Sequence, residues 1–202
     1  MSAPPRTAPS SSRPRRGREL VLAAATALFH ERGYDATSMS DIADRLGVTK
    51  AALYRHVKGR AELLHAVTAP VRTGVLALLA ASRTTDLPPV EALAALLRAL
   101  ADAAAGDPAR HALFWAAHGT TSRQGPDALC RQAVCRRLAD LLERAAAQGD
   151  VRDDLEPRLA ARLLLGAVIG PGGPAYEAPA SSASVVGLLL DGMGRVPLAR
   201  PA

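Results

Sequence analysis

Aromatic residues are scarce in this chain, whose 202 residues include three tyrosines, two phenylalanines and one tryptophan. Alanine, by contrast, occupies 43 positions. Aromatic side chains favour strands, whereas alanine loses no side-chain entropy in a helix. The composition therefore argues against a strand-rich fold and predicts an all-α protein.

Cysteine is almost absent as well, since Cys130 and Cys135 are the two in the sequence. On a helix, side chains five residues apart point roughly 140° away from each other, so this pair is not placed to form a disulfide. We expect two buried thiols in a reducing compartment. No CxxC or HExxH pattern occurs, because His30-Glu31 is followed by Tyr34 where a second histidine would stand. We expect neither a metal site nor a cofactor.

Long hydrophobic runs are lacking too, because no stretch of about 18 apolar residues is uninterrupted. Arg15-Arg16 precedes the apolar run Leu20 to Phe29 and so imitates an export signal. Glu19 interrupts the approach to that run, and the helical spacing continues beyond it. We therefore expect a soluble cytoplasmic protein that does not cross a membrane.

The positive charge is concentrated in the first third of the chain. The formal net charge is +6 and the calculated isoelectric point about 10.1. Residues 1–66 hold 11 Lys and Arg against 6 Asp and Glu, a net of +5, whereas residues 67–202 hold 14 against 13. This excess of cations is typical of proteins that bind an acidic partner such as nucleic acid.

The first third also has a distinct helical pattern. Residues 1–14 show no periodicity and are expected to form a flexible basic arm. A helix is predicted from about residue 16 to Arg32, with Gly33 as its left-handed end. Thr37 or Ser38 can cap a second, short helix that ends at Gly47. Thr49 can then cap a third helix, after a turn of only three residues.

The rest of the chain is predicted to be helical without exception. A long helix is expected over residues 61–82, with a kink at Pro70. Further amphipathic segments follow after breaks rich in glycine and proline. Their expected ranges are 90–105, 107–118, 126–148, 156–170 and 182–195.

Residues 18–64 combine a first helix ending Leu28-Phe29, the segment Thr37 to Ala43, the turn Leu46-Gly47-Val48-Thr49, and Leu53-Tyr54-Arg55-His56-Val57-Lys58. This stretch resembles the N-terminal helix-turn-helix domain of the TetR/AcrR family of bacterial transcriptional regulators. The resemblance implies about nine helices: a DNA-binding domain over residues 15–60, and an effector-binding and dimerisation domain over residues 61–202. It also implies a homodimer on a palindromic operator.

The resemblance carries expectations for the DNA-binding residues. Lys50, Ala51, Tyr54 and Arg55 would occupy the base-reading face of the third helix. A lysine can donate to guanine O6 or N7, and an alanine can touch a thymine methyl group. Positions that usually meet the DNA backbone would be held by Thr37 or Ser38, Ser40, Tyr54, His56 and Arg60. Thr49 is a further DNA-binding candidate.

Two positions depart from the commoner family pattern. Ala51-Ala52 stands where many members have Gly-Thr, which removes a hydroxyl that could bind phosphate. Arg60 stands where lysine is usual, and this replaces a point donor by a planar fork. Neither departure assigns an operator.

The C-terminal two thirds are expected to bind an effector and to dimerise. The last two segments have apolar stripes too wide for one neighbouring face, so a second surface is expected to cover them. The resemblance implies that this surface is the same pair of helices from another subunit, with Leu159, Leu163, Val185, Leu188 and Leu189 at the dimer interface. The alternative is that these stripes lie wholly inside the monomer. An aliphatic effector pocket would be lined by Leu97, His111, Phe114, Trp115, His118 and Leu138. Ordinary core packing is the competing interpretation of each pocket residue.

Three classes of function compete on these observations. The first is a homodimeric repressor that a small-molecule effector releases from its operator, and activation in place of repression would use the same DNA contacts. The second is an architectural DNA-binding protein without an effector. The third is a helical enzyme, which is disfavoured because no nucleophile, base and orienting group occur together.

Overall fold

The computed structural model describes residues 12–116, 125–169 and 182–194, and every regular element among them is an α-helix. The chain divides into two compact units, residues 1–67 and residues 68–202. The predicted boundary lay at residue 60, seven residues earlier. The first turns of the fourth helix belong to the N-terminal unit, and Leu63, Leu64 and Val67 in these turns are buried.

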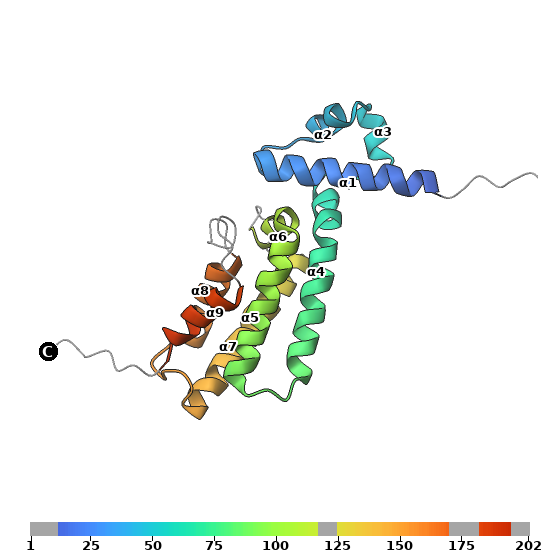
Figure 1. Ribbon diagram of the computed structural model, residues 1–202. Helices are drawn as coiled ribbons and strands as arrows, with labels where there is room; N and C mark the ends of the chain where they lie inside the picture. The colour runs from blue at the N-terminus through green and yellow to red at the C-terminus, as the bar shows by residue number, and fades with distance from the viewer. Residues whose placement is uncertain (1–11, 117–124, 170–181, 195–202) are drawn as a thin grey trace, which may run out of the picture. The chain divides into compact units, whose positions relative to one another are not determined.

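The N-terminal unit holds α1 (Ser12–Arg32), α2 (Met39–Leu46), α3 (Lys50–Tyr54) and the start of α4 (Arg60–Thr84). Within this unit α2 and α3 lie along one side of α1 (Figure 1). The helix α1 begins at Ser12, so residues 12–14, which were assigned to the arm, are helical. The remainder of the predicted arm lies outside the described residues.

A small hydrophobic core holds these helices together. The face of α1 with Val21, Ala25, Leu28 and Phe29 is buried, as the 3.6-residue period requires. Phe29 and Tyr34 meet edge to face, with ring centroids 5.2 Å apart. The rest of the unit contributes further buried apolar side chains, from α2, α3, the connection after α3 and the start of α4: Ile42, Ala43, Leu53, Val57, Leu63 and Leu64.

The C-terminal unit holds the rest of α4 and five further helices. These are α5 (Pro89–Gly106), α6 (Pro108–Trp115), α7 (Pro126–Gln148), α8 (Pro157–Ile169) and α9 (Ser182–Asp191). The predicted ranges agree with these bounds to within a few residues. The helix α4 continues through Pro70 as one element.

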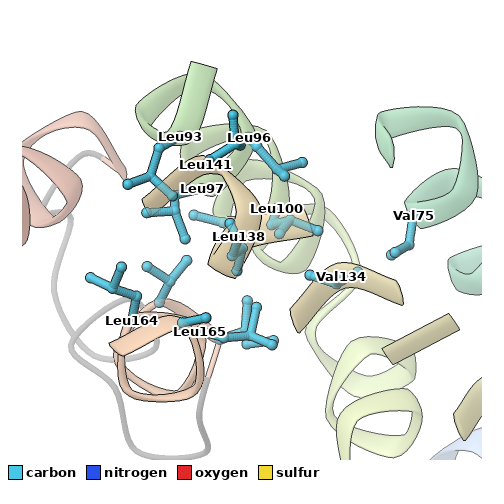
Figure 2. Close-up of a cluster of buried hydrophobic side chains, with 14 of the residues drawn as sticks. Val75, Leu93, Leu96, Leu97, Leu100, Val134, Leu138, Leu141, Leu164 and Leu165 are labelled. Atoms are coloured by element: carbon cyan, nitrogen blue, oxygen red, sulfur yellow. The ribbon is translucent and has the colours of Figure 1, made fainter. Parts of the chain in front are cut away.

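Leucines from α5, α7 and α8 converge in the core of this unit (Figure 2). Leu93, Leu97 and Leu138 have no exposed surface. Burial of a leucine contributes about 1.5–3 kcal/mol to the free energy of unfolding. The aliphatic core therefore stabilises the unit even though the chain has so few aromatic residues.

Among the described helices, α4 has the length and mean hydropathy, 1.5 over 18 residues, that a membrane-spanning helix also has. Val67, Val71, Val75 and Leu79 are buried along one side of α4. Arg72, near its middle, pairs with Asp127 of α7. Within that window 39% of the residues are buried, so these contacts account for part of its apolar surface.

Candidate nucleic-acid interface

A capping box fixes the start of α2. The Ser38 hydroxyl accepts the Asp41 amide at 3.2 Å, and the Asp41 carboxylate accepts the Ser38 amide at 2.7 Å. Hydrogen bonds from the Ser38 hydroxyl and amide hold the pKa of Asp41 below its usual value of 3.8, and the charge of Arg32 assists. Of the two predicted candidates, Thr37 and Ser38, it is Ser38 that caps α2.

The turn between α2 and α3 is closed by a left-handed glycine. Gly47 has φ 64°, and its amide and that of Val48 donate to the carbonyls of Asp44 and Ala43 at 3.1 and 3.0 Å. This pair of bonds is a Schellman motif, which satisfies carbonyls that the helix end would leave free. The Thr49 hydroxyl then accepts the Ala52 amide at 3.2 Å and starts α3.

The helix α3 buries one residue and exposes the opposite side to solvent. Leu53 is buried, whereas Lys50, Ala51, Tyr54 and Arg55 are exposed. Tyr54 is 49% exposed, which is a large exposure for a tyrosine side chain. These four residues, defined here as the α3 face, are the ones predicted to read bases.

Thr37 was one of two alternatives, with Ser38, for a contact with the DNA backbone. Thr37 is completely buried, and its hydroxyl donates to the Gly33 carbonyl at 2.8 Å and to that of Leu28 at 3.3 Å. A buried and saturated hydroxyl cannot reach a phosphate, so the expectation for the Thr37 side chain is corrected. The neighbouring Ser38 is exposed and Ser40 is half-buried.

Arg60 forms a clamp on the turn between α1 and α2. One of its terminal nitrogens, Nη1, donates to the carbonyls of Asp35, Thr37 and Tyr34 at 2.9, 3.1 and 3.2 Å. Its guanidinium carbon lies 4.4 Å from the Tyr34 ring centroid. The Nη1 contacts of Arg60 are thus made within the protein, its side chain keeps partial exposure, and its contact with the DNA backbone stays a prediction.

His56 is half-buried beside α1. A Cβ on Gly17 would lie 3.1 Å from its Cε1 atom, so the imidazole packs close to a position that holds no side chain. A larger residue at position 17 would push the ring out of place. His56 keeps partial exposure, and its contact with DNA stays a prediction.

Sequence reasoning missed the ion pair that joins α1 to α2. Both carboxylate oxygens of Glu31 accept from Arg45, each at 3.0 Å. The hydrogen bond from Arg45 lowers the pKa of Glu31. The two residues lie 14 positions apart, so local spacing gave no signal for this pair.

The predicted effector residues are mostly core. Leu97, Phe114 and Leu138 have no exposed surface, and none of them lines the pocket described next. His111 is buried, and burial lowers its pKa, which favours the neutral imidazole. His118 lies outside the described residues. The burial of these side chains agrees with core packing, the alternative interpretation to ligand contact.

A pocket of about 350 Å³ lies among α6, α7 and α8. Trp115 is the one predicted effector residue that lines it. The remaining lining residues were not predicted: Ala112, Ala116, Arg131, Cys135, Arg162, Leu165, Gly166 and Ile169. Arg131 and Cys135 stand four apart within the predicted helix 126–148, a spacing that places both on one helix face.

The predicted dimer residues lie on the outer surface of the C-terminal unit. Leu159, Leu163 and Leu188 are 47%, 65% and 77% exposed, and Val185 and Leu189 are half-buried. Except for Val185, these residues line a groove of about 540 Å³ between α8 and α9. Exposed leucines grouped in this way are typical of a surface that a partner covers.

Each of the two units contains residues that match the model of a known protein family. The model of the "Bacterial regulatory proteins, tetR family" matches residues 21–67. The model of the "Transcriptional regulator SbtR-like, C-terminal domain" matches residues 88–195, more than half of the chain. Together the two models cover α2 and α3 of the N-terminal unit and α5 to α9 of the C-terminal unit.

A curated relative is similar over a short part of the chain. The HTH-type transcriptional activator FasR of Mycolicibacterium smegmatis is 49% identical over 53 residues, which are 26% of this chain and 23% of that protein. The chain thus spans about a quarter of the length of this relative.

Two solved structures share the whole fold. The ketosteroid transcriptional regulator KstR2 of Mycobacterium tuberculosis superposes with a TM-score of 0.73 at 21% identity, covering 93% of this chain and 98% of that one. AibR in complex with isovaleryl coenzyme A and operator DNA gives a TM-score of 0.66 at 22% identity, covering 87% and 97%.

Proposed function

The chain belongs to the TetR/AcrR family of DNA-binding transcriptional regulators, and we propose that it is a homodimeric repressor that a small-molecule effector releases from a palindromic operator. The exposed α3 face, held by two caps and a rigid turn, is the observation that carries this proposal. As a DNA-binding regulator without an enzymatic activity, the protein would work in the cytoplasm.

The α3 face would lie in the major groove of DNA. Lys50 would donate to guanine O6 or N7, and Ala51 would contact a thymine methyl group. Tyr54 and Arg55 would contact bases or adjacent phosphates from the same face. Ser38, Ser40, Thr49 and His56 would contact the DNA backbone and set the angle of entry.

The exposed leucines of α8 and α9 would form the dimer interface. Burial of Leu163 and Leu188 against a second copy would remove apolar surface from water, at about 25 cal/mol per Å². A two-fold axis makes the same patch serve both subunits. The two α3 faces would then address half-sites about one helical turn, or 34–36 Å, apart.

The helix α4 would pass the effector signal to the N-terminal unit. Asp127, in the first turn of α7, accepts the Thr68 hydroxyl at 2.7 Å and pairs with Arg72, and both partners lie on α4. Residues 60–67 of the same helix belong to the N-terminal unit. A coupling of about 1–3 kcal/mol between effector and operator would change operator affinity about 5- to 150-fold.

Fluorescence anisotropy with duplexes from the region upstream of the protein's own coding sequence tests the proposal. We expect a palindromic duplex to bind at least about a thousandfold tighter than a scrambled one at physiological salt. Lys50→Ala should remove most of this preference, whereas Arg83→Ala, an exposed substitution at the end of α4, should leave it unchanged. Equal affinity for all duplexes with a steep salt dependence would instead indicate an architectural DNA-binding protein.

The direction of regulation requires a separate measurement, because the relative FasR is described as an activator. A reporter gene under the bound promoter should rise in expression when the regulator is deleted. A fall in expression would replace repression by activation and leave the DNA-binding part of the proposal intact.

A further inference from the structure

A proline interrupts the hydrogen-bond pattern of α4 close to the boundary between the two units. Pro70 lies three residues beyond Val67, the last residue of the N-terminal unit. Because proline has no backbone N–H, the carbonyl of Ala66 lacks the donor that the helix would otherwise supply. The proline ring also crowds this carbonyl, and sharp bends in helices occur mostly at such positions. Pro70 therefore marks the place where α4 bends most easily.

One carboxylate of α7 holds α4 on both sides of Pro70. The Oδ2 atom of Asp127 accepts the Thr68 hydroxyl at 2.7 Å, and its Oδ1 atom accepts from Nη1 of Arg72 at 2.5 Å. Thr68 precedes the proline by two residues, and Arg72 follows it by two. The two oxygens of a single side chain thus bind both flanks of the weak point in the helix. We define Asp127, Thr68 and Arg72 as the α4 clamp.

The α4 clamp is shielded from water, whereas Pro70 is exposed. Thr68 is 1% and Asp127 6% exposed, and the side chain of Arg72 is partly buried. Charge-assisted hydrogen bonds are strong in such surroundings, because little water competes for the donors and acceptors. Asp127 also lies in the first turn of α7, where the helix dipole favours a carboxylate. The geometry therefore provides a strong local constraint on α4.

Arg131 connects the α4 clamp to the pocket among α6, α7 and α8. This arginine lies one helical turn after Asp127 on α7, and it lines the pocket. Burial lowers the pKa of Arg131, and the charge of Asp127 partly opposes this fall. Arg131 also donates to the Phe114 carbonyl, near the end of α6, at 2.6 Å. A group that binds in the pocket can therefore change the charges that Asp127 faces.

We propose that Pro70 is a hinge in α4 and that Asp127 is the positioning residue that holds this hinge rigid, so that residues 60–67 keep their DNA-binding arrangement. This inference rests on the proposed function, because it names the residues through which operator binding is regulated. Beyond the hinge, Val71 and Val75 pack in the core of the C-terminal unit. Release of Asp127 would free the turns before the hinge, which belong to the N-terminal unit.

Operator affinity of full-length variants, measured by fluorescence anisotropy, tests the α4 clamp. Asp127→Asn keeps the size of the side chain but removes its charge, and it should weaken operator binding about tenfold, within the range usual for coupling between distant sites. Thr68→Val has nearly the same shape, leaves the Arg72–Asp127 pair intact and should weaken binding about threefold or more. Wild-type affinity in both variants would overturn the proposal.

Arg137→Gln is the matched control, because it removes another polar contact between α7 and α4. The Nε atom of Arg137 donates to the Ser82 hydroxyl at 3.2 Å, and Ser82 lies on α4 beyond the hinge. Operator affinity of this variant should stay within about twofold of wild type, because the contact does not span Pro70. An equal loss of affinity in Asp127→Asn and Arg137→Gln would show that the position of the hinge does not matter and would overturn the proposal.

Replacement of the proline distinguishes a hinge from a merely structural ion pair. Pro70 is exposed, so Pro70→Ala loses no buried contact, and alanine supplies the amide that the Ala66 carbonyl lacks. In this stiffer background Asp127→Asn should change operator affinity less than about threefold, and the double-mutant cycle measures the difference. A purely structural role of Asp127 would make its loss equally large in both backgrounds, and that result would overturn the proposal.

Hydrogen exchange of the DNA-free protein separates this inference from the proposed function. Backbone amides of residues 66–74 should exchange about tenfold faster in Asp127→Asn than in wild type or Arg137→Gln, because the constraint on the hinge is lost. If the wild-type chain binds no palindromic duplex but this difference is seen, the proposed function is wrong and the clamp is present. If the wild-type chain binds its operator but Asp127→Asn changes neither exchange nor affinity, the clamp is wrong and the proposed function stands.

Discussion

At the scale of single residues, Arg60 shows how one side chain can be structural at a position that sequence assigns to the nucleic acid. Its three carbonyl contacts and the Tyr34 ring hold the turn between α1 and α2 against the start of α4. A planar fork suits this cluster of acceptors better than the point charge of lysine. The departure from the commoner lysine therefore has a local physical explanation.

Replacement of Arg60 by lysine should lower the free energy of unfolding by about 1–2 kcal/mol, because the fork geometry and the ring contact are lost. Urea denaturation measures this change. Operator affinity of the folded variant should stay within about threefold of wild type, below the effect of losing a base contact. Unchanged stability combined with weaker, less salt-dependent DNA binding would identify Arg60 as a phosphate contact.

The capping box makes a prediction about pH. Because the folded-state pKa of Asp41 is lowered, its stabilising effect is present above the unfolded value and is lost as the pH falls through the folded one. A carboxyl titration by NMR should place the pKa of Asp41 below 3.8 and show that Ser38→Ala raises it. A pKa of Asp41 that Ser38→Ala leaves unchanged would contradict this cause.

At the scale of elements, the pair α2 and α3 is held by backbone chemistry more than by helix propensity. A five-residue helix such as α3 is not stable alone, because nucleation costs more than so few hydrogen bonds recover. The Thr49 cap, the buried Leu53 and the Schellman motif at Gly47 supply what is missing. A rigid turn lets the α3 face keep one orientation.

Gly47→Ala should destabilise the protein by about 1–2 kcal/mol, because φ 64° is unfavourable for alanine. Gly74→Ala is the control, since it lies inside α4, has no positive φ and has open space for a Cβ. That variant should be more stable by up to about 1 kcal/mol. Equal responses of the two variants in urea denaturation would show that the left-handed turn is not the cause.

Most elements could be predicted from the sequence because their signals are local. Glycine stops, hydroxyl caps and the 3.6-residue period lie within one or two turns of the residues that they control, and the range 126–148 of α7 was predicted to the residue. The contacts of Thr37, Arg60 and Glu31 could not be predicted, because each depends on a partner that only the tertiary fold brings near. Leu97, Phe114 and Leu138 were assigned to a pocket because an apolar pocket wall and a core have the same composition.

At the scale of the whole molecule, the boundary between the basic and the nearly neutral part of the sequence coincides with the boundary between the two units. The basic first third corresponds to the unit with the α3 face, and the nearly neutral remainder to the unit with the exposed leucines. One unit is thus suited to an acidic polymer, and the other to an apolar partner.

Leu163→Glu should weaken the proposed dimer at least about tenfold, because it places a charge where apolar surface would be desolvated. Sedimentation velocity across a concentration series measures this change. Leu129→Glu, at a position on α7 that is 61% exposed, is the matched control and should leave the dimer intact. A wild-type chain that stays monomeric at all concentrations would exclude the interface.

The central claim is that two copies of the α3 face enter the major groove in register. Methylation interference reports it directly, because methylation of guanine N7 blocks the major-groove edge. We predict interference at two groups of guanines, with centres about 10 base pairs or a multiple of it apart, and loss of one position in each group with Lys50→Ala. Interference confined to adenine N3 in the minor groove, or a single group that Lys50→Ala leaves unchanged, would contradict the account.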